Sequence, residues 1–216
     1  MTFTCIHSYF ERMNDRLELE KKLWNEGFSR VIGLDEVGRG CLAGPVVAAG
    51  VIFRKNEWVE GIRDSKAIPE PVRKELAAEI KEKAAFWVVQ ECSIHEIDEL
   101  NILWASIRAM EKCIEAEGAQ PDYLLIDGNK FSPSLIPHTC VVKGDDKSVS
   151  IGAASILAKV YRDELMKNLH TTYPFYGWDT NVGYPTQAHY KGLHEYGITT
   201  HHRRSFNLKT QKLYQG

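Results

Sequence analysis

The stretch GLDEVGRG, residues 33–40, places two carboxylates side by side at the end of the apolar run 31–34. Neighbouring side chains of a regular strand point to opposite faces, so Asp35 and Glu36 reach one spot only if the backbone leaves strand geometry at or just after Glu36. The Gly-Arg-Gly that follows allows that break. For an isolated Asp-Glu pair a solvated turn is the simpler explanation, so the rest of the chain has to decide.

The composition is that of an ordinary globular protein. At 216 residues, with 44% hydrophobic and 26% charged residues, the chain fits one large domain, with or without an appended terminal piece. No signal peptide or run of about eighteen apolar residues is present. The five cysteines are scattered and never form Cys-x-x-Cys, so neither a disulfide framework nor a zinc knuckle is indicated. We therefore expect a soluble, cytoplasmic protein without a membrane partner, and a monomer.

The net charge of −2 argues against a chain coated in positive charge. It does not exclude nucleic acid, because a basic footprint can be local and an acidic metal site would offset it in the sum. The chain is locally basic from Lys191 onward. On charge alone a solubilising tail and a phosphate-binding surface fit this part equally well, and we interpret HHRR, residues 201–204, as a polar surface facing phosphate rather than as a metal site.

The periodicity of apolar residues predicts an α/β fold, with a mixed sheet flanked by helices. The first strands suggest an antiparallel start, and later strands alternate with helices. We expect an N-terminal helical segment, 1–28, followed by one domain, 29–216. Helices are predicted over 15–26, 69–83, 94–117 with a break near Asn101, 150–169 and 185–196, and strands over 30–34, 44–53, 86–92, 122–126 and 139–142.

Acidic residues follow three of the predicted strands: Asp35 and Glu36, then Asp127, then Asp145. In open sheets that contain parallel strands, ligands gather beyond the carboxyl ends of those strands. Four carboxylates in one cleft repel one another unless cations lie between them, and hard oxygen ligands suit Mg²⁺ or Mn²⁺. Two such ions form a clamp for phosphodiester cleavage. Any one acid alone is explained by turn capping, but four at successive strand ends favour a metal site.

Three other features have competing interpretations. The stretch GRGCLAGP, residues 38–45, resembles a mononucleotide loop, but it lacks the Gly-Lys-Ser/Thr ending and precedes an apolar strand. Trp24, Trp87 and Trp104 are interpreted as core or helix-packing residues rather than base-stacking platforms. Asp163 is interpreted as an ion-pair partner on a helix surface.

Ordered motifs from about residue 31 to 206 resemble those of ribonuclease HII, the bacterial type 2 ribonuclease H. The resemblance implies a ribonuclease H-like fold with a mixed five-stranded sheet and additional C-terminal helices that bind substrate. It also implies hydrolysis of RNA paired to DNA and cleavage 5′ of ribonucleotides embedded in duplex DNA, which leaves 3′-hydroxyl and 5′-phosphate ends. The motifs are GLDEVGRGCLAGPVVAAGVIF, RDSKAI, IDELNILWASIRAM, LLIDGN, VVKGDDKSVSIGAASILAKVYRD, NVGYPTQAHYKGLHEYG and HHRRSF.

By this resemblance the catalytic, metal-binding acids are the same four that follow the strands: Asp35, Glu36, Asp127 and Asp145. The implied cofactors are two Mg²⁺ or Mn²⁺ ions. The implied substrate-binding residues are Gly38, Arg39 and Gly40, with Tyr184 against the sugar and Lys66, Lys143 and Ser155 as phosphate contacts. Asp146, beside the last acid, is interpreted as an outer-shell or solvated group.

Two alternatives stay open. Ribonuclease HIII is a sister enzyme whose pattern lacks the arginine of Gly-Arg-Gly and carries a separate N-terminal domain. Arg39 and the short N-terminal segment favour ribonuclease HII. A nucleic-acid binding module that keeps the fold without catalysis would need a missing acid, and none of the four is missing.

Overall fold

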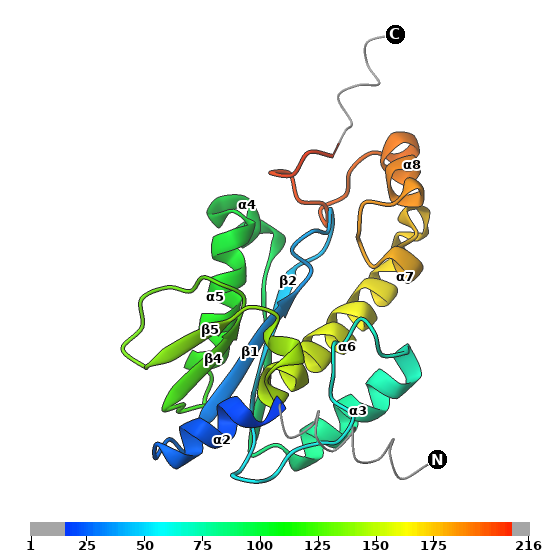
Figure 1. The fold of residues 1–216 in the computed structure, drawn as a ribbon. Coiled ribbons are helices and arrows are strands. Elements are labelled where there is room, and N and C mark those ends of the chain that lie inside the picture. The colour runs from blue at the N-terminus through cyan, green and yellow to red at the C-terminus, as the bar shows by residue number, and fades with distance from the viewer. Residues whose placement is uncertain (1–15, 209–216) are drawn as a thin grey trace.

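The computed structural model describes residues 16–208, which form a five-stranded sheet with helices on both faces (Figure 1). The strand order is β3-β2-β1-β4-β5. β1 pairs antiparallel with β2 and parallel with β4, while β2–β3 is antiparallel and β4–β5 is parallel. The mixed sheet predicted from the sequence is therefore confirmed. The strands are β1 (Val31–Val37), β2 (Val46–Ile52), β3 (Phe86–Cys92), β4 (Tyr123–Asp127) and β5 (His138–Val141).

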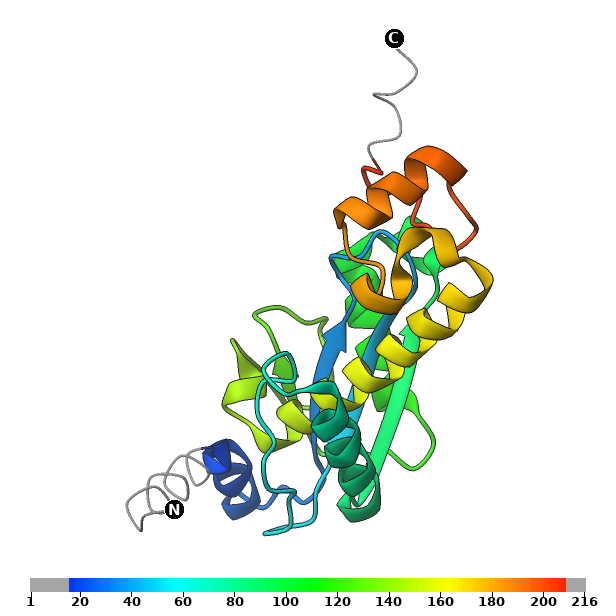
Figure 2. The same ribbon diagram turned by 90° about the vertical axis from the view of Figure 1, so that its right-hand side faces the viewer.

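The longest helix, α6, runs along one face of the sheet against β1 and β2, as Figures 1 and 2 show. α5 covers β2 and β3 on the other face. The helices are α2 (Glu18–Asn25), α3 (Glu70–Lys83), α4 (Ile94–Leu100), α5 (Ile102–Glu115), α6 (Val149–Thr172), α7 (Trp178–Asn181) and α8 (Gln187–Tyr196), with 3-10 turns η1 (Gly144–Asp146) and η2 (Pro174–Tyr176).

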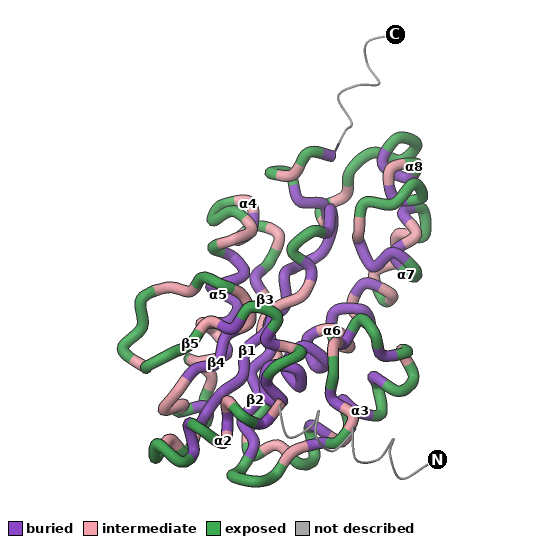
Figure 3. The backbone as a smooth tube through the Cα atoms, in the orientation of Figure 1, coloured by how far each residue is buried: buried purple, intermediate pink, exposed green. Residues whose placement is uncertain are grey.

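The two faces of the sheet bury separate apolar clusters. Val47 and Ala49 of β2 pack with α6, whereas Val46 and Ala48 pack with α5. Because successive side chains alternate between faces, a strand covered on both sides must be apolar throughout. All seven residues of β2 are buried, as the tube in Figure 3 shows.

Two predicted helix features can be checked in detail. The expected break near Asn101 is present: this residue has φ +65° and its side-chain oxygen accepts hydrogen bonds from the backbone N–H groups of Leu103 and Trp104. It therefore separates α4 from α5 by capping α5. The helix predicted over 15–26 is α2, which starts at Glu18, and residue 15 lies outside the described residues. The short α7 and the two 3-10 turns were not predicted.

α2 packs onto the same core as the sheet, since its Leu23 and Trp24 are buried among residues of β1, β2 and α6. The proposed division at residue 28 therefore does not separate two cores. Residues 1–15 of the predicted N-terminal segment and residues 209–216 of the predicted domain lie outside the described part. Between residues 16 and 208, no helix is long and apolar enough to cross a membrane.

Candidate active site

The four predicted acids lie on neighbouring elements at one end of the sheet. Asp35 and Glu36 are in β1, and Asp127 is the last residue of the adjacent parallel strand β4. Asp145 lies in η1, four residues beyond the end of β5. β1 continues to Val37, and the predicted backbone break comes at Gly38, which has φ +97°.

Burial and mutual repulsion disturb the protonation of these acids. Burial raises the pKa of Asp35 well above its usual value, and the charges of Glu36 and Asp127 raise it further. Burial also raises the pKa of Glu36 to about 7, although Arg39 opposes the shift. The pKa of Asp145 is raised by burial and then by Asp127. The charges of the four acids thus act on one another across three elements.

Hydrogen bonds fix the acids to their surroundings. The backbone N–H of Gly144 donates to Asp127 Oδ1 over 2.6 Å, which ties β4 to the turn that carries Asp145. Ser155 of α6 hydrogen-bonds to the Asp35 carboxylate. The Ser155 hydroxyl also lies 3.0 Å from the Ser65 hydroxyl and is buried. Ser155 therefore orients Asp35, and its predicted phosphate contact stays a prediction.

The donor set fits divalent ions of the magnesium type. Such ions bind carboxylate oxygens, and their charge would relieve the repulsion that raises these pKa values. Among residues 16–208, however, no group of three or more His, Cys, Asp or Glu side chains is already close enough together to coordinate a metal ion. The residues that would hold the ions are Asp35, Glu36, Asp127 and Asp145.

Two fully buried arginines hold the loop that follows β1. Arg162 of α6 donates to the carbonyl oxygens of Pro45, Val182 and Ala43 over 2.8–3.0 Å. Arg203 donates to the carbonyl oxygens of Gly44, Arg39 and Pro45 over 2.9–3.1 Å. Five of these six bonds attach the loop that contains Gly-Arg-Gly to α6 and to the C-terminal segment, and the sixth holds Val182.

The interpretation of HHRR as a phosphate-facing surface is wrong for two of its residues. His202 and Arg203 are 1% and 0% exposed. His202 Nε2 lies 3.1 Å from His189 Nε2, and its Nδ1 accepts a hydrogen bond from the backbone N–H of Thr199. Only Arg204 of the arginine pair is exposed. Buried polar groups need partners: those of His202 are Thr199 and His189, and those of Arg203 are the carbonyls of the distant loop 39–45.

Tyr184 lies against the Gly-Arg-Gly loop. A Cβ placed on Gly40 would be 3.7 Å from Tyr184 Cε1, with no closer neighbour outside the adjacent residues. The ring is half-buried, and burial raises the pKa of its hydroxyl. The carbonyl of Tyr184 lies 3.0 Å from His189 Nδ1. The structure therefore brings together the predicted sugar-binding residues Gly40 and Tyr184.

The predicted lysine contacts are exposed beside the acids. Lys66 opposes the rise in the pKa of Asp145, so it lies within electrostatic range of that acid, and Lys143 directly precedes η1. Asp64 adds to the rise and was missed by the sequence analysis, although it belongs to the quoted motif RDSKAI. Asp146 forms an ion pair with Arg16 at 3.1 Å.

The surroundings of the remaining side chains agree with the sequence analysis for some residues and differ for others. Arg39 pairs with Glu36 at 3.3 Å. Asp163 does form ion pairs, with Arg73 and Lys159, but it is buried rather than on the surface. Trp24 is buried as predicted, whereas Trp87 and Trp104 are 39% and 43% exposed. Lysines approach both exposed rings: Lys81 Nζ is 4.9 Å from the Trp87 ring centroid and Lys130 Nζ is 5.3 Å from that of Trp104.

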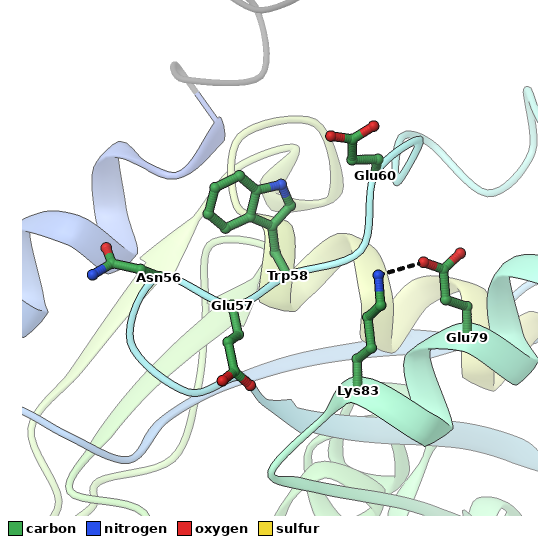
Figure 4. Close-up of a pocket in the computed structure, with 6 residues that line it drawn as sticks. All are labelled: Asn56, Glu57, Trp58, Glu60, Glu79 and Lys83. Atoms are coloured by element: carbon green, nitrogen blue, oxygen red, sulfur yellow. Dashed lines mark hydrogen bonds and ion pairs between the residues drawn. The ribbon is translucent and has the colours of Figure 1, made fainter.

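Figure 4 shows a separate surface pocket. Four of its six residues come shortly after the end of β2. That end of β2 pairs with the start of β1, so the pocket lies at the end of the sheet opposite to the acids. Its one lysine, Lys83, is already paired with Glu79 at 2.7 Å. The excess of carboxylates makes it a poor phosphate site. The pocket is lined by Asn56, Glu57, Trp58, Glu60, Glu79 and Lys83.

Two sequence comparisons agree on one family. The sequence model described as ribonuclease HII matches residues 32–209. A ribonuclease HII of Salinibacter ruber is 50% identical over 196 residues, which cover 89% of this chain and 98% of the relative. The crystal structure of ribonuclease H2 from Pyrococcus horikoshii superposes with a TM-score of 0.72 and 24% identity, covering 84% of this chain and 95% of that chain. A ribonuclease HIII (Bst-RNase HIII) in complex with Mn²⁺ has a TM-score of 0.62 and 20% identity, covering 84% and 68%. The two solved structures support the fold.

Proposed function

The chain belongs to the ribonuclease HII family and is a type 2 ribonuclease H endoribonuclease, and we propose that it cuts both RNA–DNA hybrids and single ribonucleotides embedded in duplex DNA. In embedded sites the cut falls 5′ of the ribonucleotide and leaves a 3′-hydroxyl and a 5′-phosphate. Membership of this family removes the ribonuclease HIII alternative. The presence of all four acids argues against a non-catalytic binding module.

The observation that carries the substrate proposal is the contact between Gly40 and Tyr184. Acids that hold metal ions can cleave a phosphodiester but do not distinguish RNA from DNA, a choice that requires contact with the 2′-hydroxyl. Gly40 is exposed and carries no side chain, so a sugar can approach its backbone closely. The Tyr184 ring borders the same spot. Gly40 thus follows Asp35 and Glu36 closely in the chain, whereas Tyr184 comes from the segment between α7 and α8.

The family depends on divalent metal, and we propose that Asp35, Glu36, Asp127 and Asp145 hold two Mg²⁺ or Mn²⁺ ions. When bound, such ions activate the attacking water and stabilise the leaving oxygen. The chain's own residues orient the acids and offer contacts to phosphate. Ser155 and the Gly144 amide orient two of the acids, while the exposed side chains of Lys66 and Lys143 are available to phosphate.

The partner that this arrangement fits is a nucleic-acid duplex, which we propose the enzyme binds as a monomer in the cytoplasm. The described cysteines are all free, and burial raises the pKa of the thiols of Cys41, Cys92, Cys113 and Cys140. Such thiols are poor nucleophiles, which suits a reducing compartment.

Cleavage of a DNA duplex with one ribonucleotide, with and without Mg²⁺ or Mn²⁺, tests the proposed function. We expect one ion-dependent cut on the 5′ side of the ribonucleotide and none in the all-DNA duplex. Cleavage of long hybrids but not of the embedded ribonucleotide would contradict the specific proposal while leaving the family activity intact.

Variants of Tyr184 separate its role from folding. Tyr184→Ala should reduce cleavage at the embedded ribonucleotide sharply and affect long hybrids less, because a hybrid offers many alternative registers. Tyr184→Phe keeps the ring and loses the hydroxyl, so its rate should be intermediate. Equal losses on both substrates, with melting temperatures unchanged, would show that Tyr184 does not read the ribonucleotide.

A further inference from the structure

Glu20, in the N-terminal helix α2, is a buried carboxylate bound to the start of α6. The residue is 2% exposed. Its Oε1 accepts hydrogen bonds from the Ser150 backbone N–H over 3.0 Å and from the hydroxyls of Ser148 and Ser150 over 2.5 Å. A helix leaves the N–H groups of its first turn without internal partners and attracts negative charge there. Glu20 therefore fixes the first turn of α6 from outside that helix.

The first turn of α6 contacts the supports of two catalytic acids. On one side, Ser150 packs so closely on Gly33 that a Cβ at Gly33 would lie 2.2 Å from the Ser150 carbonyl carbon. Gly33 is two residues before Asp35 in β1. On the other side, the Ser148 backbone N–H donates to the Gly144 carbonyl over 2.8 Å, in the turn that carries Asp145.

A second residue before β1, Arg16, contacts the turn η1 that carries Asp145. Arg16 Nη2 lies 3.1 Å from Asp146 Oδ1, and Arg16 Nη1 donates to the Ile62 carbonyl over 2.7 Å. Asp146 is thereby held on the side of Arg16, next to Asp145. The residues before β1 thus contact the turn that carries Asp145 through Arg16, and the adjoining first turn of α6 through Glu20.

We propose that Glu20 is a positioning residue that sets the spacing of Asp35 and Asp145, and through it the affinity of the site for divalent ions. This inference rests on the proposed metal-dependent function. It assigns a positioning role to a helix that lies before residues 32–209, the part matched by the family's sequence model.

The hydrogen bonding of Glu20 suits positioning better than stability alone. Its second oxygen, Oε2, is buried without a hydrogen-bond partner in the part of the chain that the structure describes. An unpaired buried carboxylate oxygen is destabilising. Proteins depart from full pairing mainly where a functional arrangement requires it. The charge and short hydrogen bonds of Glu20 define the position of the α6 turn at a cost in folding free energy.

The test compares Glu20→Gln and Glu20→Ala with Glu18→Gln, which alters an exposed glutamate of the same helix. Two quantities are measured for each protein: the Mg²⁺ concentration that half-saturates cleavage, and the Mn²⁺ dissociation constant from calorimetry without substrate. Circular dichroism melts report folding. The calorimetric measurement does not depend on turnover.

We expect Glu20→Ala to raise both metal constants at least fivefold and Glu20→Gln to raise them less, while Glu18→Gln leaves them unchanged. High Mg²⁺ should recover part of the lost rate. If Glu20→Ala does not fold, Ser150→Ala removes one of the same hydrogen bonds and should raise both constants. A lower melting temperature with unchanged metal constants would overturn the inference. A wild-type enzyme that neither binds ions nor cleaves would instead contradict the proposed function.

Discussion

Arg162 occupies the space that a side chain at Gly38 would need: a Cβ there would lie 2.3 Å from Arg162 Nε. Arg162 cannot readily move, because it is fully buried and bonded to three backbone carbonyls. Gly38 also has φ +97°, a conformation unfavourable for other residues. The first glycine of Gly-Arg-Gly is thus required by packing.

Gly38→Ala should therefore destabilise the protein by roughly 1–3 kcal/mol and reduce cleavage on every substrate. Gly40→Ala is the matched control, since its Cβ would meet only Tyr184 at 3.7 Å. It should fold normally but lose activity, because the methyl group lies where the sugar is proposed to approach. Chemical denaturation and cleavage rates measure the two effects. Equal stability losses in the two variants would contradict this difference.

Asp35→Asn tests the electrostatic cost of the acid cluster. The pKa of Asp35 is raised by burial and by neighbouring acids, so its charge destabilises the ion-free fold. Without divalent ions the variant should melt above wild type. Added Mg²⁺ should raise the melting temperature of wild type much more than that of the variant, and cleavage should be nearly abolished.

Asp146→Asn is the neighbouring control, because Asp146 pairs with Arg16, does not act on Asp35, and adds to the rise in the pKa of Asp145 only after burial, Asp127 and Asp64. We expect this variant to retain substantial activity and its response to Mg²⁺. Near-normal cleavage by Asp35→Asn at saturating Mg²⁺ would remove Asp35 from the metal site.

Replacement of Arg203 and of Arg204 should have different consequences. Arg203→Ala leaves the carbonyls of Gly44 and Arg39 without this donor, whereas Pro45 keeps its hydrogen bond from Arg162, and each lost partner costs about 1–3 kcal/mol. Arg204 is exposed, so Arg204→Ala should keep the fold. If Arg204 contacts phosphate, that variant also has a shallower slope of log affinity against log salt. Thermal melts and binding at several salt concentrations separate the two roles; a stable Arg203→Ala protein would contradict the loop-anchoring role.

The acids of the site could be predicted from the sequence, whereas the hydrogen bonds of Arg203 could not. Strand-end logic found Asp35 and Asp127 because parallel neighbours carry their last residues to the same edge. The same logic cannot show that Arg203 bonds to Gly44, since backbone carbonyls are common to every residue and carry no sequence signal. Residues 203 and 44 meet only in the folded chain.

The sequence also could not show which tryptophans are buried, or that Glu20 is buried, because burial depends on contacts made only in the folded chain. A tryptophan on a predicted strand or helix has an apolar ring whether it faces the core or solvent, so Trp24 and Trp104 looked alike. Glu20 follows the pattern of a solvated helix face, and only the position of Ser148 and Ser150 explains its burial.

His202 makes stability depend on pH. Burial lowers its pKa from 6.5 to about 3, with nearby His189 and His201 adding to the shift. The unfolded chain binds this proton more readily, so the stabilising contribution is complete above about pH 6.5 and is lost as the pH falls toward 3. Between about pH 7.5 and about pH 5, on the order of 2 kcal/mol should be lost from this group.

His202→Gln cannot ionise, so its unfolding free energy should fall less over that pH range, even if it is lower at neutral pH. His194→Gln, an exposed change in α8, is the control and should follow wild type. Urea unfolding at both pH values measures the difference. The same acid loss in wild type and His202→Gln would exclude His202 as its source.

Trp104 and Trp87 form similar exposed pairs with lysines, but at opposite ends of the sheet. Trp104 is in the first turn of α5. This helix comes after α4, beyond the end of β3, and that end of β3 pairs with the start of β2. The partner of Trp104, Lys130, is three residues after Asp127. Trp87 pairs with Val51 near the other end. An aromatic ring beside a cation near the acids is suited to a sugar or base and its phosphate.

Trp104→Ala should therefore weaken binding of an RNA–DNA hybrid by about 1 kcal/mol or more, or about fivefold. Trp87→Ala removes an equally exposed ring and should change affinity less than about twofold, within the range of a neutral surface substitution. Trp104→Phe, which keeps an aromatic face, should recover part of the loss. The measurement is fluorescence anisotropy of a labelled hybrid in EDTA, which prevents cleavage, with melts to confirm folding. Equal affinities for Trp104→Ala and Trp87→Ala would show that the position of Trp104 toward the acid end of the sheet has no role in binding the duplex.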